Sequence, residues 1–127
     1  MEDLNIEGTP KTPTIRFDMN SGEMLIKGRS IPENSIEFYK PLTDALDAYC
    51  EYPQAETKVI IQLEYFNTSS SKCILDVFKK LEKINSGDSN VVINWHYEED
   101  DEDMLEAGED YEAIINVPFK MIEVEEE

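Results

Sequence analysis

The run from Lys58 to Phe66 constrains the fold more than any other part of the chain. It reads Lys-Val-Ile-Ile-Gln-Leu-Glu-Tyr-Phe and is rich in β-branched and aromatic residues. Such residues favour strands, and a nearly unbroken run of them is typical of a central strand that is buried on both faces. We therefore place this run at the centre of a β-sheet with helices packed against it.

The segments on either side alternate between strand-like and helix-like patterns. Residues 14–19 and 23–31 alternate in polarity around Asn20-Ser21-Gly22, which predicts a β-hairpin. Asn34 with Glu37 resembles a capping box, and apolar residues from Ile36 onward recur at helical steps. By the same criteria, a helix is predicted at 72–84 and strands at 90–97 and 119–124, and Met104, Leu105, Ala107 and Tyr111 form a weak helical stripe within 98–112.

The predicted order is thus β-β-α-β-α-β-α-β. Strand–helix–strand units imply right-handed crossovers between parallel neighbours, and the first hairpin adds an antiparallel edge. The fold class is α/β, with a single mixed sheet, an N-terminal antiparallel hairpin and packed helices. A chain of 127 residues suits one domain, 1–127, in which 1–11 form a loose leader and 125–127 an acidic tail.

The net charge of −18 argues against some classes of binding partner. So acidic a surface repels nucleic acid and anionic membranes, so we expect neither as a partner. No apolar run approaches the ~20 residues that span a bilayer, and the N-terminus shows no secretory signal. We expect a cytoplasmic protein in which Cys50 and Cys73 are reduced core thiols.

The hydroxyl cluster Asn67-Thr68-Ser69-Ser70-Ser71 follows the central strand directly and precedes a predicted helix. The first backbone N–H groups of a helix lack partners within it, and Asn, Ser or Thr can accept from them as an N-cap. The same helix end stabilises an anion, including a phosphate attached to a hydroxyl. The cluster is therefore either a plain cap or a phosphorylation site.

The stretch 98–112 holds ten acidic residues and no basic one. A calcium-binding EF-hand loop requires a Gly at its sharp turn, and the first acidic run of this stretch contains none. We therefore predict a solvated helix start or a partner-facing surface, and no metal site. The single histidine, His96, lies on a predicted strand with no second chemical group beside it, and we expect a structural or solvent-facing role. With no catalytic motif in the chain, we predict neither enzymatic activity nor a cofactor.

Three stretches together resemble the SiaC-family regulatory phosphoproteins of bacteria, and the likeness runs from about Leu4 to the last predicted strand. They are Ile31-Pro-Glu-Asn-Ser35, Leu63-Glu-Tyr-Phe-Asn-Thr-Ser-Ser70 and Trp95-His-Tyr-Glu-Glu-Asp-Asp-Glu-Asp-Met104. The resemblance implies a fold similar to the STAS-like domain of anti-sigma-factor antagonists. It also implies reversible phosphorylation by a serine/threonine kinase and a PP2C-type phosphatase. In such a partner switch, the unphosphorylated form binds and activates a diguanylate cyclase, which promotes biofilm formation through c-di-GMP.

The acceptor position of the family falls on Thr68 in this sequence. Ser69, Ser70 and Ser71 are alternative acceptors, because the outward-facing hydroxyl depends on where the helix begins. The predicted partner-binding residues are Asn67, Thr68, Ser69 and Ser70, with Asp100, Asp101 and Asp103 as a further candidate surface. Two rival hypotheses are a constitutive acidic binding module, such as an anti-sigma-factor antagonist, and a small enzyme or anion-binding protein that uses the junction as an oxyanion site.

Overall fold

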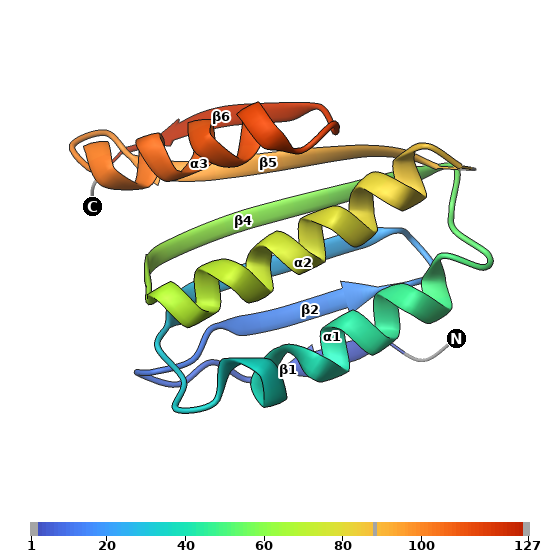
Figure 1. Cartoon of the computed structure of the whole chain (residues 1–127), viewed down its shortest axis with the longest axis horizontal. Coiled ribbons are helices and arrows are strands. Elements are labelled where there is room, and N and C mark those ends of the chain that lie inside the picture. The colour runs from blue at the N-terminus through green and yellow to red at the C-terminus, as the bar shows by residue number, and fades with distance from the viewer. Residues whose placement is uncertain (1–2, 88, 126–127) are drawn as a thin grey trace.

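The computed structural model describes residues 3–87 and 89–125, which form one mixed sheet and three helices (Figure 1). The sheet has six strands in the order β1-β2-β3-β4-β5-β6. In chain order the elements are β1 (Leu4–Ile6), β2 (Thr14–Asp18), β3 (Glu23–Ser30), α1 (Ser35–Tyr49), β4 (Glu56–Phe66), α2 (Thr68–Asn85), β5 (Asn90–Glu98), α3 (Glu102–Ile114) and β6 (Phe119–Val124).

The predicted fold class is confirmed. Strands β1, β2 and β3 pair antiparallel, whereas β3, β4, β5 and β6 pair parallel, each with the next strand in the chain. The predicted hairpin is the β2–β3 pair, in which Gly22 adopts a positive φ of 77° at the turn. Asn34 caps α1 by accepting from the Glu37 N–H, as the capping-box pattern predicts.

Strand β1 lies within the segment that the sequence analysis treats as a loose leader. Leu4 pairs with Phe17 and Ile6 with Ile15, and both β1 side chains pack against the core. A strand of three residues is too short to show an alternating pattern, which explains the difference. Of the predicted acidic tail, residues 126 and 127 lie outside the described residues, as do residues 1 and 2 of the leader.

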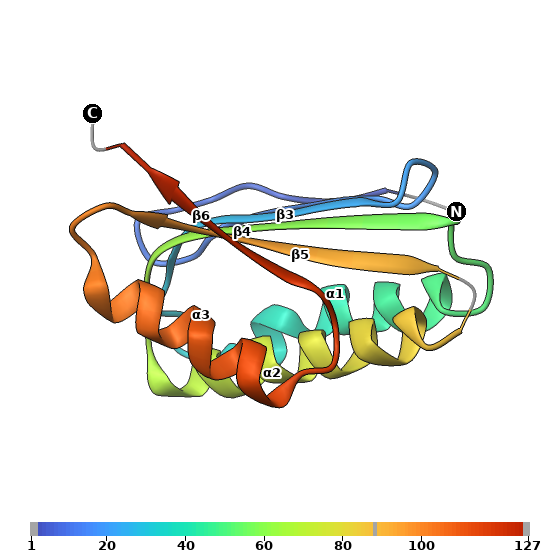
Figure 2. The ribbon, with the colours of Figure 1, turned by 90° about the horizontal axis from the view of Figure 1, so that it is seen from above.

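All three described helices lie on one face of the sheet (Figure 2). The prediction that Lys58–Phe66 is buried on both faces is therefore wrong: Val59 and Ile61 are buried, whereas Lys58 is exposed on the other face. The cause is topological. Because β3, β4, β5 and β6 follow one another in a single direction, right-handed crossovers carry every helix to the same side.

The core between sheet and helices is rich in aromatic residues. Trp95 of β5 is fully buried and lies near Phe66, Phe78 and Tyr111. Its indole N–H donates to the Met104 carbonyl of α3 at 3.0 Å. A Cβ on Gly108 would lie 2.6 Å from the indole ring, so α3 approaches the sheet this closely only because residue 108 is glycine. Trp95 is thus the main anchor of α3.

No helix among the described residues has both the length and the apolar character that crossing a lipid bilayer requires.

Candidate functional site

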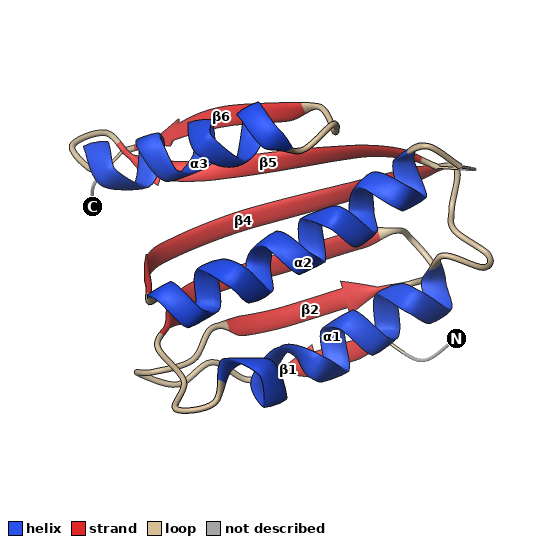
Figure 3. Ribbon diagram, in the orientation of Figure 1, coloured by secondary structure: helices blue, strands red, loops and turns tan. Residues whose placement is uncertain are grey.

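Helices α1, α2 and α3 run side by side across the sheet (Figure 3). The colours of Figure 1 show that all three begin at the same edge of the sheet. They follow β3, β4 and β5, which are parallel, so their N-termini lie where these strands end. Each helix has a side-chain cap: Asn34 accepts from Glu37 N, Asn67 from Ser70 N at 2.8 Å, and Asp101 from Met104 N. Helix N-termini carry partial positive charge, so this edge favours an added anion.

Ser70, in the first turn of α2, is fully buried. The Ser30 hydroxyl donates to Ser70 Oγ at 2.8 Å, and the Ser70 hydroxyl donates to the Ser30 carbonyl at 3.1 Å. The Tyr39 hydroxyl lies 2.6 Å from Ser30 Oγ, and burial raises the pKa of Tyr39 to about 12. These contacts join α2, β3 and α1, so Ser70 has a structural role.

The hydroxyls of Ser69 and Ser71 connect α2 with its two neighbouring helices. Ser69 Oγ lies 2.7 Å from Ser35 Oγ at the start of α1 and also donates to Asn67 Oδ1. The Tyr111 hydroxyl of α3 donates to the Ser71 carbonyl at 2.9 Å and to Ser71 Oγ at 3.2 Å. Burial raises the pKa of Tyr111, which keeps this phenol protonated as a donor.

Thr68 is the first residue of α2 and is exposed. Its hydroxyl makes no hydrogen bond with any residue in the ranges 3–87 and 89–125, unlike those of Ser69, Ser70 and Ser71. Among the four candidate acceptors, Thr68 therefore combines an accessible hydroxyl with one that no protein contact occupies. A group attached to this hydroxyl would leave the packing of the helix undisturbed.

The acidic residues of the second candidate surface lie at the same edge, after β5. Asp100 and Asp103 are exposed, whereas Asp101 is half-buried and its carboxylate caps α3. The described residues show no hydrogen bond between these aspartates and the hydroxyl cluster. Nor do three or more described His, Cys, Asp or Glu side chains gather where they could hold a metal ion.

Two exposed apolar side chains belong to the segments that meet at this junction, and neither was predicted from the sequence to lie at the surface. Ile36 is 77% exposed next to Ser35, although the helical periodicity assigns it to the buried face of α1. Tyr65 is 53% exposed near the end of β4, two residues before Asn67. Large exposed apolar side chains beside an accessible hydroxyl are typical of a docking surface.

His96 lies apart from the cluster. Its half-buried side chain is on the face of the sheet that no described helix covers, and burial together with nearby Lys58 lowers its pKa. Its imidazole is therefore harder to protonate than one in free solution.

Comparisons with known proteins cover almost the entire chain. A family model described as SiaC family regulatory phosphoprotein matches residues 6–124. An uncharacterized protein of Pseudomonas aeruginosa strain UCBPP-PA14 is 34% identical over 119 residues, which cover 94% of each chain. The crystal structure of apo-SiaC from Pseudomonas aeruginosa is similar with a TM-score of 0.86 and 32% identity, over 96% of this chain and 99% of that chain. A chain in the crystal structure of the diguanylate cyclase SiaD in complex with its activator SiaC, from the same bacterium, has a TM-score of 0.89 and 32% identity, over 96% of this chain and 100% of that chain.

Proposed function

Since this chain belongs to the SiaC family of regulatory phosphoproteins, we propose that it is a cytoplasmic, non-enzymatic partner switch controlled by phosphorylation of Thr68. Its unphosphorylated form binds and activates a diguanylate cyclase, and phosphorylation releases that cyclase. A serine/threonine kinase and a PP2C-type phosphatase set the balance between the two forms. The similar SiaC chain that forms a complex with the cyclase SiaD supports the choice of partner.

The observation that carries the proposal is the exposed Thr68 hydroxyl at the N-terminus of α2. A phosphate adds about −1.5 to −2 charge at neutral pH. At a helix N-terminus this charge is favourable, and Lys72 is four residues further along the same helix face. The fold therefore tolerates the phosphate, and modification changes the surface without unfolding the domain.

The same phosphate interferes with a docked partner. Ile36 follows Ser35, whose hydroxyl lies 2.7 Å from that of Ser69, and Tyr65 precedes the cap residue Asn67 by two positions. A partner that covers this junction of α1, β4 and α2 also covers the acceptor hydroxyl. A phosphate there must lose its hydration shell and adds bulk and negative charge to the interface. A loss of about 3 kcal/mol lowers affinity by more than a hundredfold, which is enough for a switch.

The test measures binding and activation of the partner cyclase by the purified protein in its unphosphorylated and fully phosphorylated forms. We expect phosphorylation to weaken binding by about a hundredfold, Thr68→Ala to bind normally and resist modification, and Thr68→Glu to bind less well. Thr68→Gln is the matched control, because it has the size of Glu without its charge. Equal affinity of the phosphorylated and unphosphorylated forms would refute the switch.

A constitutive acidic binding module, such as an anti-sigma-factor antagonist, is the second candidate. The exposed carboxylates of Asp100 and Asp103 favour it, because they are free to meet a basic partner surface. Charge reversal at these two positions abolishes partner binding in that case, whereas Thr68→Glu has little effect. Asp101 is left unchanged in this experiment because its carboxylate caps α3.

A further inference from the structure

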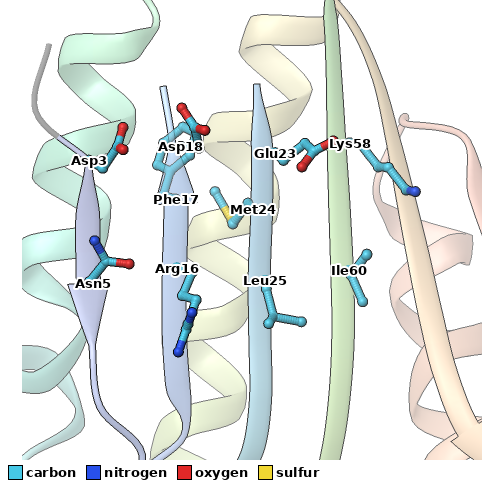
Figure 4. A pocket seen from close by; sticks show the side chains of 10 residues that line it. All are labelled: Asp3, Asn5, Arg16, Phe17, Asp18, Glu23, Met24, Leu25, Lys58 and Ile60. Atoms are coloured by element: carbon cyan, nitrogen blue, oxygen red, sulfur yellow. The ribbon is translucent and has the colours of Figure 1, made fainter. Parts of the chain in front are cut away.

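The face of the sheet opposite the helices carries two rows of outward side chains that cross the strands. The strand pairings align Asn5, Arg16, Leu25, Ile60, Asn94 and Lys120 in the first row. Figure 4 shows the Asn5, Arg16, Leu25 and Ile60 side chains on neighbouring strands. The second row, two residues further along, holds Thr14, Lys27, Gln62, His96 and Ile122. We call these two rows the central band.

The central band contains no carboxylate, although the chain has 29 acidic residues and only 11 Lys and Arg. Arg16, Lys27 and Lys120 are exposed in it, and Lys58 adjoins its first row. Acidic residues appear only beyond the two rows. Among them are Asp3, Asp18 and Glu23 at one end and Glu64 and Glu98 at the other. On the uncovered face the cations are therefore gathered in the central band, and carboxylates lie along both of its sides.

Apolar side chains lie between these cations and are only half-buried. They are Leu25, Ile60 and Ile122. The band is also hollowed at two places. One hollow of about 400 Å³ is lined by Arg16, Leu25 and Ile60 of the band and, at its outer end, by the carboxylates of Asp3, Asp18 and Glu23. Another of about 330 Å³ is lined by Lys27, Gln62 and His96 of the band and, at its outer end, by Glu64, Glu98 and Asp101. A half-exposed apolar strip bordered by cations is complementary, in apolar contact and in charge, to an apolar surface of a partner that is bordered by carboxylates.

We propose that the central band binds an amphipathic α-helix of a partner protein whose apolar stripe is flanked by Asp and Glu. Strands lie ~4.8 Å apart, so six strands span about 24 Å, which is the length of a helix of about 16 residues. The two rows are separated by roughly 7 Å along the strands, so both touch a helix about 10 Å across.

The distribution of charge favours this occupant over two others. Two copies of the chain that met through their central bands would bring Arg16, Lys27 and Lys120 against like charges. Nucleic acid has charge but no apolar stripe, so it would leave Leu25, Ile60 and Ile122 without an apolar partner, and its continuous phosphate backbone would meet the acidic residues on both sides of the band. The inference does not depend on Thr68, which lies at an edge of the sheet and not on this face.

The test uses a fluorescein-labelled 16-residue helical peptide of leucine and glutamate, with leucine on one stripe, and measures its binding by anisotropy. A leucine–lysine peptide of the same pattern is the first control, and a glutamate–serine peptide without an apolar stripe is the second. We expect only the leucine–glutamate peptide to bind, with an affinity that falls as salt is raised.

Two protein variants locate the binding. We expect Lys27→Glu in the central band to weaken binding of the leucine–glutamate peptide by about tenfold or more, because it places a like charge at the contact. Lys79→Glu makes the same change in net charge on the exposed face of α2 and is the matched control. Lys120→Glu, on the edge strand β6, repeats the experiment at a second position. Circular dichroism melting curves check that each variant folds.

Several results would overturn the proposal. They are no detectable binding of the leucine–glutamate peptide, equal binding of the leucine–lysine peptide, and equal losses in Lys27→Glu and Lys79→Glu. A dimer in sedimentation velocity that Lys27→Glu dissociates would assign the central band to a second copy of the chain. Displacement of the peptide by a short DNA duplex would assign it to nucleic acid.

Discussion

Replacing Gly108 by Ala tests how α3 is anchored. The new Cβ would lie 2.6 Å from Trp95 Cδ1 and Nε1, whereas carbon atoms in contact are normally about 3.5–4.0 Å apart. Trp95 is fully buried among aromatic rings and cannot yield, so α3 must retreat by about 1 Å. That movement stretches the 3.0 Å hydrogen bond from the indole N–H to the Met104 carbonyl.

The expected loss in the free energy of unfolding is about 3 kcal/mol. Overpacking costs about 1–3 kcal/mol, and a buried donor without its partner costs about 1–3 kcal/mol. The higher helix propensity of Ala offsets about 1 kcal/mol of this. For a domain of this size, a loss of about 3 kcal/mol lowers Tm by roughly 12 °C.

Urea denaturation followed by tryptophan fluorescence measures the effect directly, because Trp95 is the only tryptophan of the chain. Gly87→Ala is the matched control. A Cβ there would meet its nearest neighbour, the Ile84 carbonyl oxygen, at an ordinary 3.5 Å, so we expect stability to change by less than about 1 kcal/mol. A Gly108→Ala variant at least as stable as the wild type would refute the argument from the Trp95 contact.

Three further predictions concern the candidate site. Ser70→Ala should lower the free energy of unfolding measured in urea by about 1–2 kcal/mol, because the Ser30 hydroxyl loses its acceptor. Thr68 should still accept phosphate in this variant. Unchanged stability would contradict the structural role of the Ser30–Ser70 hydrogen bond. Because burial raises the pKa of Tyr39 from 10.0 to about 12, its contribution to stability is complete below pH 10 and is lost as the pH rises toward 12. Relative to Tyr39→Phe, the wild type should thus lose roughly 2–3 kcal/mol over this range in alkaline denaturation, and parallel curves would count against it. Finally, Lys72→Gln should reduce the stabilisation of α2 by a phosphate on Thr68 by roughly 0.3–1 kcal/mol, measured by comparing melts of both forms with and without the substitution; an unchanged difference would exclude this ion pair.

The sequence predicted the elements whose patterns are long enough to repeat. The hairpin, the parallel strands and the cap at Asn34 all follow from local preferences that the tertiary structure preserves. It missed β1, whose three residues show no period, and it took the Lys58–Phe66 strand to be buried on both faces. Lys58, Gln62 and Glu64 alternate with apolar residues within the central strand and were the available signal that one face stays open.

The candidate site was predictable in position but not in its contacts. The junction at Asn67 was recognisable because a strand pattern ends where a hydroxyl cluster begins. The roles of the individual hydroxyls depend on α2 starting at Thr68, which turns Ser70 inward toward Ser30, a residue 40 positions away. A contact at that separation leaves no local pattern, so no periodicity distinguishes Ser70 from Thr68.

The strand order of the sheet also determines how the protein is assembled. Each strand pairs with the strand that precedes it in the chain. During synthesis from the N-terminus, each new strand can therefore pair with the edge strand of a sheet that has already formed. Pairing between such near neighbours keeps contact order low for a sheet protein and favours rapid folding. The end of the sheet at which Thr68 lies is the exception, because the Ser71 carbonyl there accepts a hydrogen bond from the hydroxyl of Tyr111, which comes 40 residues later in the chain. The hydrogen bonds around the start of α2 are therefore complete only when α3, the last helix, has packed against the sheet.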